Sequence, residues 1–277
     1  MLHDLYLDDL LRHALLEDIG TGDITSTSTI PPDRSANGRF IAKADLVVCG
    51  IHVTQRVFTL IDDTIRFTIH VKDGVFVPAG TVLAELSGNA RAILTGERVA
   101  LNFLQLMSGI ATRTRQSVIA VQGTRVRITD TRKTTPGLRV LEKYAVRVGG
   151  GSNHRFNLSD GILIKDNHIK AAGSITKAVR AARQTAPHTL KIEVEAENAE
   201  MVEEALACGA DIIMLDNMSV DDMAAAVRMI GGRAVVEASG NMGDKDLLSV
   251  AQTGVDLISI GALTHTISAA DISLRFN

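Results

Sequence analysis

Lysine and arginine gather in the middle of this 277-residue chain, where they could bind an anion. Ten Lys and Arg residues against four Asp and Glu lie between Arg125 and Lys170, although the whole chain has a net charge of −3. A basic segment in an acidic protein favours a small anionic ligand, whereas a protein that coats nucleic acid usually has a basic excess. We therefore expect a small-molecule site and no nucleic-acid partner.

Several of these cations stand at the ends of short apolar runs or beside a run of glycines. Arginine holds a ligand with two carboxylates better than lysine does, because its planar guanidinium donates two parallel hydrogen bonds. A lone histidine is usually a core or surface residue, so His154 is of interest mainly through its neighbour Arg155. The cations that the sequence suggests for an anion pocket are Arg98, Arg132, Lys133, His154, Arg155 and Lys165.

Two acids, Glu195 and Asp216, close successive apolar runs. If these runs are neighbouring strands, the two carboxylates lie close together and would repel an anionic substrate unless a cation bridges them. Mg²⁺ is usually held by one or two carboxylates and by substrate phosphates. The pair is therefore a candidate Mg²⁺ site, and the alternative of two ordinary strand-end acids stays open.

Small residues close the last two runs, as Ser239-Gly240 and Gly261. Glycine allows the backbone to approach a ligand closely, and the N-terminus of a following helix offers free N–H groups to a phosphate. Barrel enzymes often bind phosphate at their final two strands. We expect a phosphate at this end of the site.

The second half of the chain predicts an α/β barrel, because apolar runs alternate with stretches of helical periodicity. Six strands are expected, and a seventh could lie over 145–148, whereas a closed barrel of this class needs eight strands. We therefore expect an incomplete, open barrel with its active site at the carboxyl ends of the strands. The six runs cover 125–131, 161–167, 189–198, 210–218, 233–241 and 254–263.

The first part of the chain predicts a separate α+β domain. Apolar residues at helical spacing cover 4–17, turn-forming residues follow to Pro32, and residues 37–89 read as a small, mostly antiparallel β layer. Residues 90–121 return to helical periodicity, and Gly109 is expected to break them into two helices.

The compartment is expected to be the cytoplasm. Cys49 and Cys208 are far apart and lack metal-type spacing, which is typical of free thiols in a reducing environment. The acidic N-terminal stretch does not have the pattern of a signal peptide, and no apolar run approaches the length of a membrane span. We expect no membrane partner.

The chain resembles the quinolinate phosphoribosyltransferase family, and the resemblance covers nearly its whole length. A long central stretch, TRKTTPGLRVLEKYAVRVGGGSNHRFNLSDGILIKDNHI (131–169), is the most specific part. The other stretches follow in family order: GDITS (22–26), GERVALNFLQLMSGIAT (96–112), EVE (193–195), IMLDNM (213–218), EASGN (237–241) and GALTH (261–265).

The resemblance implies an α/β-sandwich domain over 1–112, with the tail 266–277 packed back on it, and an open seven-stranded α/β barrel over 113–265. It also implies a homodimer or higher assembly with sites shared between subunits. Quinolinate would be held by Arg132, His154, Arg155 and Lys165, together with Arg98 from the partner. Lys133, Glu195 and Asp216 would be catalytic, and the last two would also serve Mg²⁺. The phosphate would lie among Ser239, Gly240, Gly261 and His265.

The reaction that the resemblance implies joins quinolinate to phosphoribosyl pyrophosphate (PRPP), giving nicotinate mononucleotide, pyrophosphate and CO2 for NAD biosynthesis. Three alternatives remain. Lys165 at a strand end could form a Schiff base in an aldolase-type lyase. The chain could be a related phosphoribosyltransferase-like protein of molybdenum uptake, or a binding protein without activity, but the pattern SNHRFNLSDGILIKDNHI is intact.

Overall fold

The computed structural model describes residues 4–276, which divide into two compact units. Of the described residues, the first unit contains 4–115, 136–150 and 267–276, and the second contains 116–135 and 151–266. Residues 136–150, which the sequence suggested for the barrel, thus cluster with the first unit. In that segment the Tyr144 hydroxyl donates a hydrogen bond to the Asp73 carboxylate at 2.9 Å.

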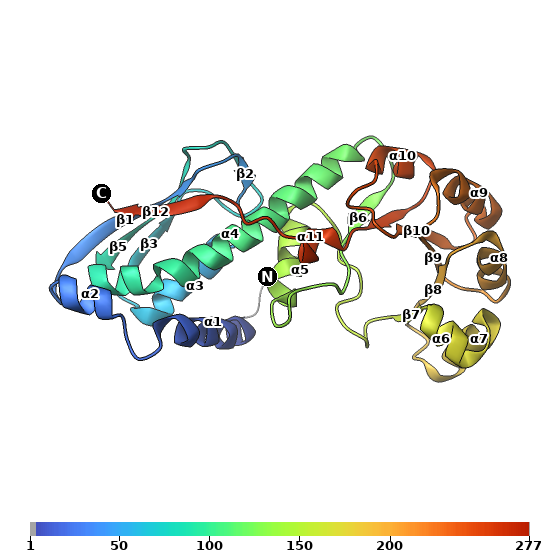
Figure 1. Ribbon diagram of the computed structural model, residues 1–277, viewed down its shortest axis with the longest axis horizontal. Helices are drawn as coiled ribbons and strands as arrows, with labels where there is room; N and C mark the ends of the chain where they lie inside the picture. Colours follow the sequence, from blue (N-terminus) through green and yellow to red (C-terminus); the bar gives the residue numbers. More distant parts are fainter. Residues whose placement is uncertain (1–3, 277) are drawn as a thin grey trace. The chain divides into compact units, whose positions relative to one another are not determined.

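An antiparallel sheet of order β12-β1-β5-β3 forms the centre of the first unit. Its strands are β1 (Ser35–Ala42), β3 (Arg66–Ile69), β5 (Val82–Asn89) and β12 (Ile272–Phe276). The last strand comes from the far end of the chain and lies along β1, with Ala42 opposite Ile272 (Figure 1). Two short strands, β2 (Leu46–Val47) and β4 (Phe76–Val77), form a separate antiparallel pair.

The helices of the first unit are α1 (Asp4–Ile19), α2 (Ile24–Thr29), α3 (Ile51–Ile61), α5 (Arg139–Val148) and most of α4 (Ala90–Ala120). A cluster of three aromatic rings, Phe40, Phe58 and Phe67, links α3 to the sheet. The mostly antiparallel β layer predicted over 37–89 is confirmed, but α3 lies within this range and was not predicted. The short strand expected over 145–148 is wrong, since these residues belong to α5.

Helix α4 runs without interruption through Gly109, so the predicted break at this glycine is wrong. Position 109 requires a glycine because another segment of the chain, which contains Ser268, passes very close to the helix there. A Cβ added to Gly109 would lie 2.2 Å from the carbonyl oxygen of Ser268. The missing side chain therefore lets the segment that leads into β12 cross the helix.

A parallel sheet of order β6-β11-β10-β9-β8-β7 forms the second unit. Its strands are β6 (Arg127–Thr129), β7 (Ile162–Ile164), β8 (Ile192–Ala196), β9 (Ile212–Asp216), β10 (Val235–Ser239) and β11 (Leu257–Ser259). All six predicted strands are confirmed. Beside β6, Ser152 forms a single parallel bridge with Thr129, so a seventh position exists but is one residue long.

The helices between these strands follow local sequence signals. They are α6 (Asp166–Ala172), α7 (Ile175–Thr185), α8 (Ala199–Ala207), α9 (Val220–Ile230), α10 (Leu247–Gln252) and α11 (Ala262–His265). Ser174, Asn198 and Ser219 stand directly before α7, α8 and α9, and each side chain accepts a hydrogen bond from a free N–H group of the first turn. These three helices pack side by side along the outside of the curved sheet (Figure 1).

Because the helices cover the outside of the sheet, its inner face and the carboxyl ends of its strands are available to form a site.

Within residues 4–276, no helix has both the length and the apolar character needed to cross a bilayer. The fold is therefore α/β, with an antiparallel α+β unit and an open parallel barrel of the predicted kind.

The crossing at Gly109 makes a prediction about stability. Alanine normally stabilises a helix by about 1 kcal/mol relative to glycine. At Gly109 the added methyl group would overlap a backbone carbonyl, so we expect Gly109→Ala to lower the free energy of unfolding by roughly 1–3 kcal/mol. Urea unfolding followed by circular dichroism measures the change.

The control is Asn102→Ala, at an exposed position of the same helix, which should change stability by less than about 0.5 kcal/mol. A Gly109→Ala protein as stable as the natural one would show that the helix crossing does not require glycine.

Candidate active site

A cavity of about 410 Å³ lies at the carboxyl ends of the parallel strands. Nine of the twelve residues predicted for the site line it, and all belong to the second unit. They are Arg132, Lys133, His154, Arg155, Lys165, Glu195, Asp216, Ser239 and Gly240. Residues that are up to 108 positions apart in the sequence therefore face one space.

The positive side of the cavity is formed by residues that follow β6, the 152–155 segment and β7. The Lys165 ammonium donates a hydrogen bond to Glu195 Oε2 at 3.1 Å and forms an ion pair with it. Arg155 Nη1 donates to the carbonyl oxygen of Gly161 at 2.9 Å. Burial, followed by the charge of Arg132, lowers the pKa of Arg155, while Glu193 acts against this shift. Two guanidinium groups this close together favour binding of an anion between them.

Three acidic side chains form the negative side. One carboxylate oxygen from each of Glu195, Glu197 and Asp216 lies within 4.8 Å of the others. Glu195 is buried in β8, Asp216 ends the neighbouring strand β9, and Glu197 is exposed. Hard oxygen ligands at this spacing suit a divalent cation such as Mg²⁺. Sequence reasoning missed Glu197, although it lies two residues after Glu195.

Gly261 and His265 do not line the cavity but lie against Lys133, which does. A Cβ added to Gly261 would be 3.1 Å from Cδ2 of His265 and 3.1 Å from Cδ of Lys133. Thr264 Oγ1 donates to the Lys133 carbonyl oxygen at 2.8 Å and so holds this corner together. A helix does begin directly after Gly261, but α10 begins only at Leu247, so Ser239-Gly240 has no helix N-terminus beside it.

The backbone after β9 and β10 is held in left-handed conformations. Asn217 and Asn241 have φ angles of 56° and 51°, and Gly240 has a φ of 90°. Such residues are uncommon outside glycine and cluster at functional sites. A Cβ added to Gly240 would lie 2.3 Å from Oδ1 of Asn217. The asparagines line the cavity with Gly240, and the sequence analysis did not assign them to the site.

Arg98 is the one predicted site residue that belongs to a different unit from the other eleven. It is exposed on α4 and belongs to the first unit. The cavity at the strand ends is lined by residues of the second unit only.

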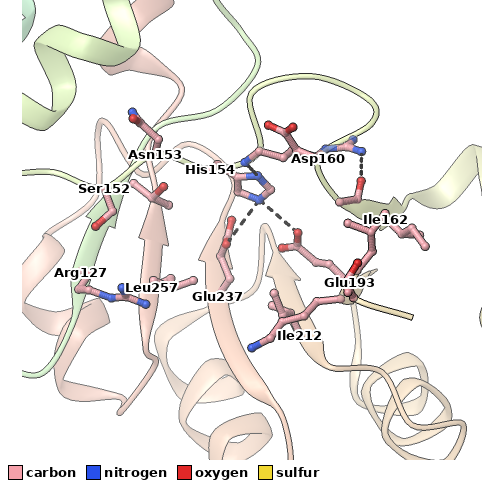
Figure 2. Close-up of a pocket in the computed structure, with 16 residues that line it drawn as sticks. Arg127, Ser152, Asn153, His154, Asp160, Ile162, Glu193, Ile212, Glu237 and Leu257 are labelled. Carbon is pink, nitrogen blue, oxygen red and sulfur yellow. Dashed lines mark hydrogen bonds and ion pairs between the residues drawn. The ribbon is translucent and has the colours of Figure 1, made fainter. Parts of the chain in front are cut away.

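A second cavity of about 350 Å³ lies deeper in the barrel, and His154, Arg155 and Glu237 line both cavities. Figure 2 shows His154 between two carboxylates that belong to non-adjacent strands, Glu193 of β8 and Glu237 of β10. His154 Nε2 lies 3.1 Å from Glu193 Oε2 and 3.7 Å from Glu237 Oε2. Burial, with the nearby Glu193 charge, raises the pKa of Glu237, and His154 opposes this.

The sequence analysis also missed Glu193 and Glu237, but strand alternation could have found them. Successive side chains of a strand point to opposite faces, so residues two apart share a face. Glu193 therefore shares the inner face of β8 with Glu195, and Glu237 shares the inner face of β10 with Ser239. The two outer members, Glu195 and Ser239, were predicted because they stand at the strand ends.

Known proteins resemble this chain in sequence and in fold over nearly its whole length. Residues 23–108 match the family described as quinolinate phosphoribosyl transferase, N-terminal domain, and residues 110–275 match its C-terminal domain. A Bacillus subtilis protein named probable nicotinate-nucleotide pyrophosphorylase (carboxylating) is 48% identical over 273 residues, which is 99% of this chain and 94% of that protein. A Mycobacterium leprae protein named nicotinate-nucleotide pyrophosphorylase (carboxylating) is 42% identical, over 99% of each chain.

A solved structure of the nicotinate-nucleotide pyrophosphorylase from Francisella tularensis superimposes with a TM-score of 0.94 at 40% identity, covering 100% of this chain and 98% of that one. The fold and the site define an α/β-barrel enzyme with a pocket for anionic small molecules. The chain belongs to the quinolinate phosphoribosyltransferase family.

The contact of Gly240 with Asn217 predicts the effect of a single methyl group. We expect Gly240→Ala to fold but to move the backbone after β9 and β10, because the Cβ and the Asn217 side chain cannot occupy the same space. A displacement of about 1 Å at an active site can cost roughly 100-fold, so kcat/KM should fall by that order. Steady-state kinetics measures the change.

Gly123→Ala is the matched control, because Gly123 also has a positive φ, 87°, but nothing within 4 Å of the added Cβ. It should lose about 1–2 kcal/mol of stability from the left-handed conformation and keep its kcat/KM. Equal kcat/KM values for the two variants would show that the close approach of Asn217 has no role in the site.

Proposed function

We propose that this chain catalyses the transfer of a phosphoribosyl group from PRPP to quinolinate, with loss of CO2, to give nicotinate mononucleotide and pyrophosphate for NAD biosynthesis. The observation that carries the proposal is one cavity with arginines and a lysine on one side and a carboxylate cluster on the other. The proposal is also supported by the names of relatives at 41–48% identity, which are nicotinate-nucleotide pyrophosphorylase (carboxylating) and quinolinate phosphoribosyltransferase (decarboxylating).

Quinolinate would lie on the positive side of the cavity. It carries two carboxylates on adjacent ring carbons, and Arg132, Arg155 and Lys165 supply the donors that such a ligand needs. Lys165 would exchange part of its contact with Glu195 for a substrate carboxylate. Arg155 is already held at Nη1 by Gly161, which leaves its other nitrogens for the ligand.

The 5′-phosphate of PRPP would lie at the corner formed by Ser239, Gly240, Gly261 and His265. Gly240 and Gly261 add no side chain of their own here, where the side chains of Asn217, His265 and Lys133 already lie close to their backbone. Lys133, which lies against Gly261 and His265, would face the leaving pyrophosphate.

Mg²⁺ is part of the proposal as the cofactor, and the donor set fits it. Glu195 and Asp216 would hold the ion, directly or through water and substrate oxygens, with Glu197 nearby. When bound, Mg²⁺ would neutralise negative charge on the pyrophosphate group.

The reaction would proceed by displacement at C1 of the ribose. The ring nitrogen of quinolinate forms a bond to C1 while the C1–oxygen bond breaks, and its electron pair leaves with pyrophosphate. Glu195 stabilises positive charge that develops on the sugar, and Lys133 stabilises the leaving group; preorganised charges of this kind are commonly worth several kcal/mol.

Decarboxylation would follow on the product of that displacement. The ring nitrogen is now positively charged, so the electron pair left on C2 when CO2 departs is stabilised, and C2 then takes a proton. No side chain needs to form a covalent bond with the substrate.

A homodimer or higher assembly in the cytoplasm completes the proposal. Arg98 is exposed in the first unit, and we propose that it reaches the site of a partner subunit, where it would add another guanidinium for the quinolinate carboxylates. The thiols of Cys49 and Cys208 are unpaired, which is compatible with a reducing compartment.

One assay tests the reaction. Purified protein with quinolinate, PRPP and Mg²⁺ should produce nicotinate mononucleotide and CO2 in equal amounts, and omission of any component should abolish the product. Nicotinate in place of quinolinate is the control for the second carboxylate and should give at least tenfold lower kcat/KM. A folded protein that makes no product with quinolinate would disprove the proposed reaction.

Sharing of the site between subunits has a separate test. Arg98→Ala and Lys165→Ala should each be inactive, because each removes one cation from every site. In mixed dimers, one of the two sites would carry both substitutions and the other would be intact. About a quarter of the natural activity should therefore return for a random mixture of dimers.

Heterodimer formation is checked with two differently tagged subunits. No recovery of activity in isolated heterodimers would mean that Arg98 acts in its own chain or not at all.

A further inference from the structure

Both ring nitrogens of His154 are used inside the protein. Nδ1 lies 2.7 Å from the main-chain nitrogen of Arg155, whose N–H donates to it. Nδ1 must therefore be the unprotonated acceptor nitrogen of the ring. The proton of neutral His154 is then on Nε2, which faces the carboxylates of Glu193 and Glu237. This arrangement leaves no ring nitrogen for quinolinate, so His154 needs a different role from the one its place in the sequence suggested.

The two carboxylates occupy buried positions that are costly to fill with acids. Glu193 is 4% exposed and Glu237 is 1% exposed. Oε1 of each of them has no hydrogen-bond partner among the residues that the structure describes. A buried carboxylate with an unsatisfied oxygen lowers stability unless another benefit offsets it. Two such acids around one histidine indicate a contribution to function instead of stability.

The contacts of His154 continue to Arg155. The main-chain N–H of His154 donates to Asp130 Oδ1 at 2.8 Å, and Asn153 Nδ2 donates to Asp130 Oδ2 at 2.5 Å. The ring then accepts the Arg155 N–H, so the main-chain N–H groups of His154 and Arg155 are both held by side chains. The guanidinium is fixed at Nη1 by Gly161, while its Nε, also buried, has no hydrogen-bond partner within residues 4–276.

We propose that Glu193 and Glu237 are positioning residues that act through His154 on Arg155. Glu193 accepts the Nε2–H of the neutral imidazole, and Glu237 lies 3.7 Å from the same nitrogen on its other side. Nδ1 of the ring holds the Arg155 main chain, and the Arg155 guanidinium is thereby directed at a substrate carboxylate. The proposal rests on the proposed function, because it assigns the carboxylate of quinolinate to Arg155.

A metal ion is the other occupant that this cluster suggests. The ligand atoms of His154, Glu193 and Glu237 all lie within 4.8 Å of one another. Metal binding at Nε2 would require both ring nitrogens to be unprotonated, because Nδ1 already accepts the Arg155 N–H. The hydrogen-bond geometry therefore favours the proton, and metal content becomes an outcome of the test.

The main test compares Glu193→Met with Glu193→Gln. Methionine fills a similar volume but removes the carboxylate oxygen that lies 3.1 Å from His154 Nε2, so we expect the KM for quinolinate to rise at least tenfold while the KM for PRPP changes less than twofold. Glutamine keeps an acceptor oxygen and should recover the KM to within about threefold of the natural value, as expected of a conservative replacement. The Met variant should be at least as stable as the natural protein, because it removes a buried acid.

Matched variants define the scale of these effects. Glu203→Gln, at an exposed position on α8, is the control for the change of charge. Arg155→Ala gives the loss expected when the guanidinium itself is absent. If Glu193→Met does not fold, Glu237→Met is measured in its place. A folded Met variant with an unchanged KM for quinolinate, or with both KM values raised equally, would overturn the proposal.

Nitrogen NMR of the histidine rings tests the network independently of activity. The His154 signals, assigned by their loss in His154→Gln, should show an unprotonated Nδ1 and a protonated Nε2. A doubly protonated ring, an Nδ1–H tautomer or a stoichiometric metal ion that is lost in Glu193→Met would refute the proposed arrangement. A natural protein with this tautomer but without quinolinate turnover would count against the proposed function and against the assigned role of Arg155, and would leave the network itself intact.

Discussion

Parallel pairing of β8, β9 and β10 is the constraint on which the site depends. The register places Glu195 beside Met214 and Ser239 beside Asp216, so that the carboxyl ends of the strands lie at one level. Side chains two residues apart then point to the same inner face. This geometry puts Glu195 and Asp216 at the upper level of the barrel and Glu193 and Glu237 below the first pair.

Opposite charges in this interior depend on one another. Lys165 pairs with Glu195 in the upper cavity, and His154 donates to Glu193 and lies 3.7 Å from Glu237. A buried charge is tolerated only when it is paired or well hydrogen-bonded. The same interior holds Arg155, whose pKa burial lowers, so an anionic ligand would relieve a cation that the protein alone does not fully satisfy.

Glycine and asparagine provide the close backbone packing that brings these groups together. Gly240 lies against Asn217, Gly261 lies against Lys133 and His265, and Gly109 lies against the segment before β12. Gly240 and Gly261 were predicted for the phosphate site, and the structure shows which side chains pack against each of them. The break predicted at Gly109 failed because helical periodicity cannot distinguish a glycine that ends a helix from one that another segment crosses.

The sequence by itself determined the six parallel strands and the polar residues at their ends, because strand period and turn chemistry are local properties of the chain. It also carried the motifs that match the family. Helices α5 and α3 also have helical periodicity in their own sequences, which the strand interpretation of 145–148 and of the β layer overlooked. Tertiary structure alone decided that Glu193 and Glu237 converge on His154. His154 and Glu237 are 83 residues apart, and no local pattern of residues specifies which distant side chains will meet.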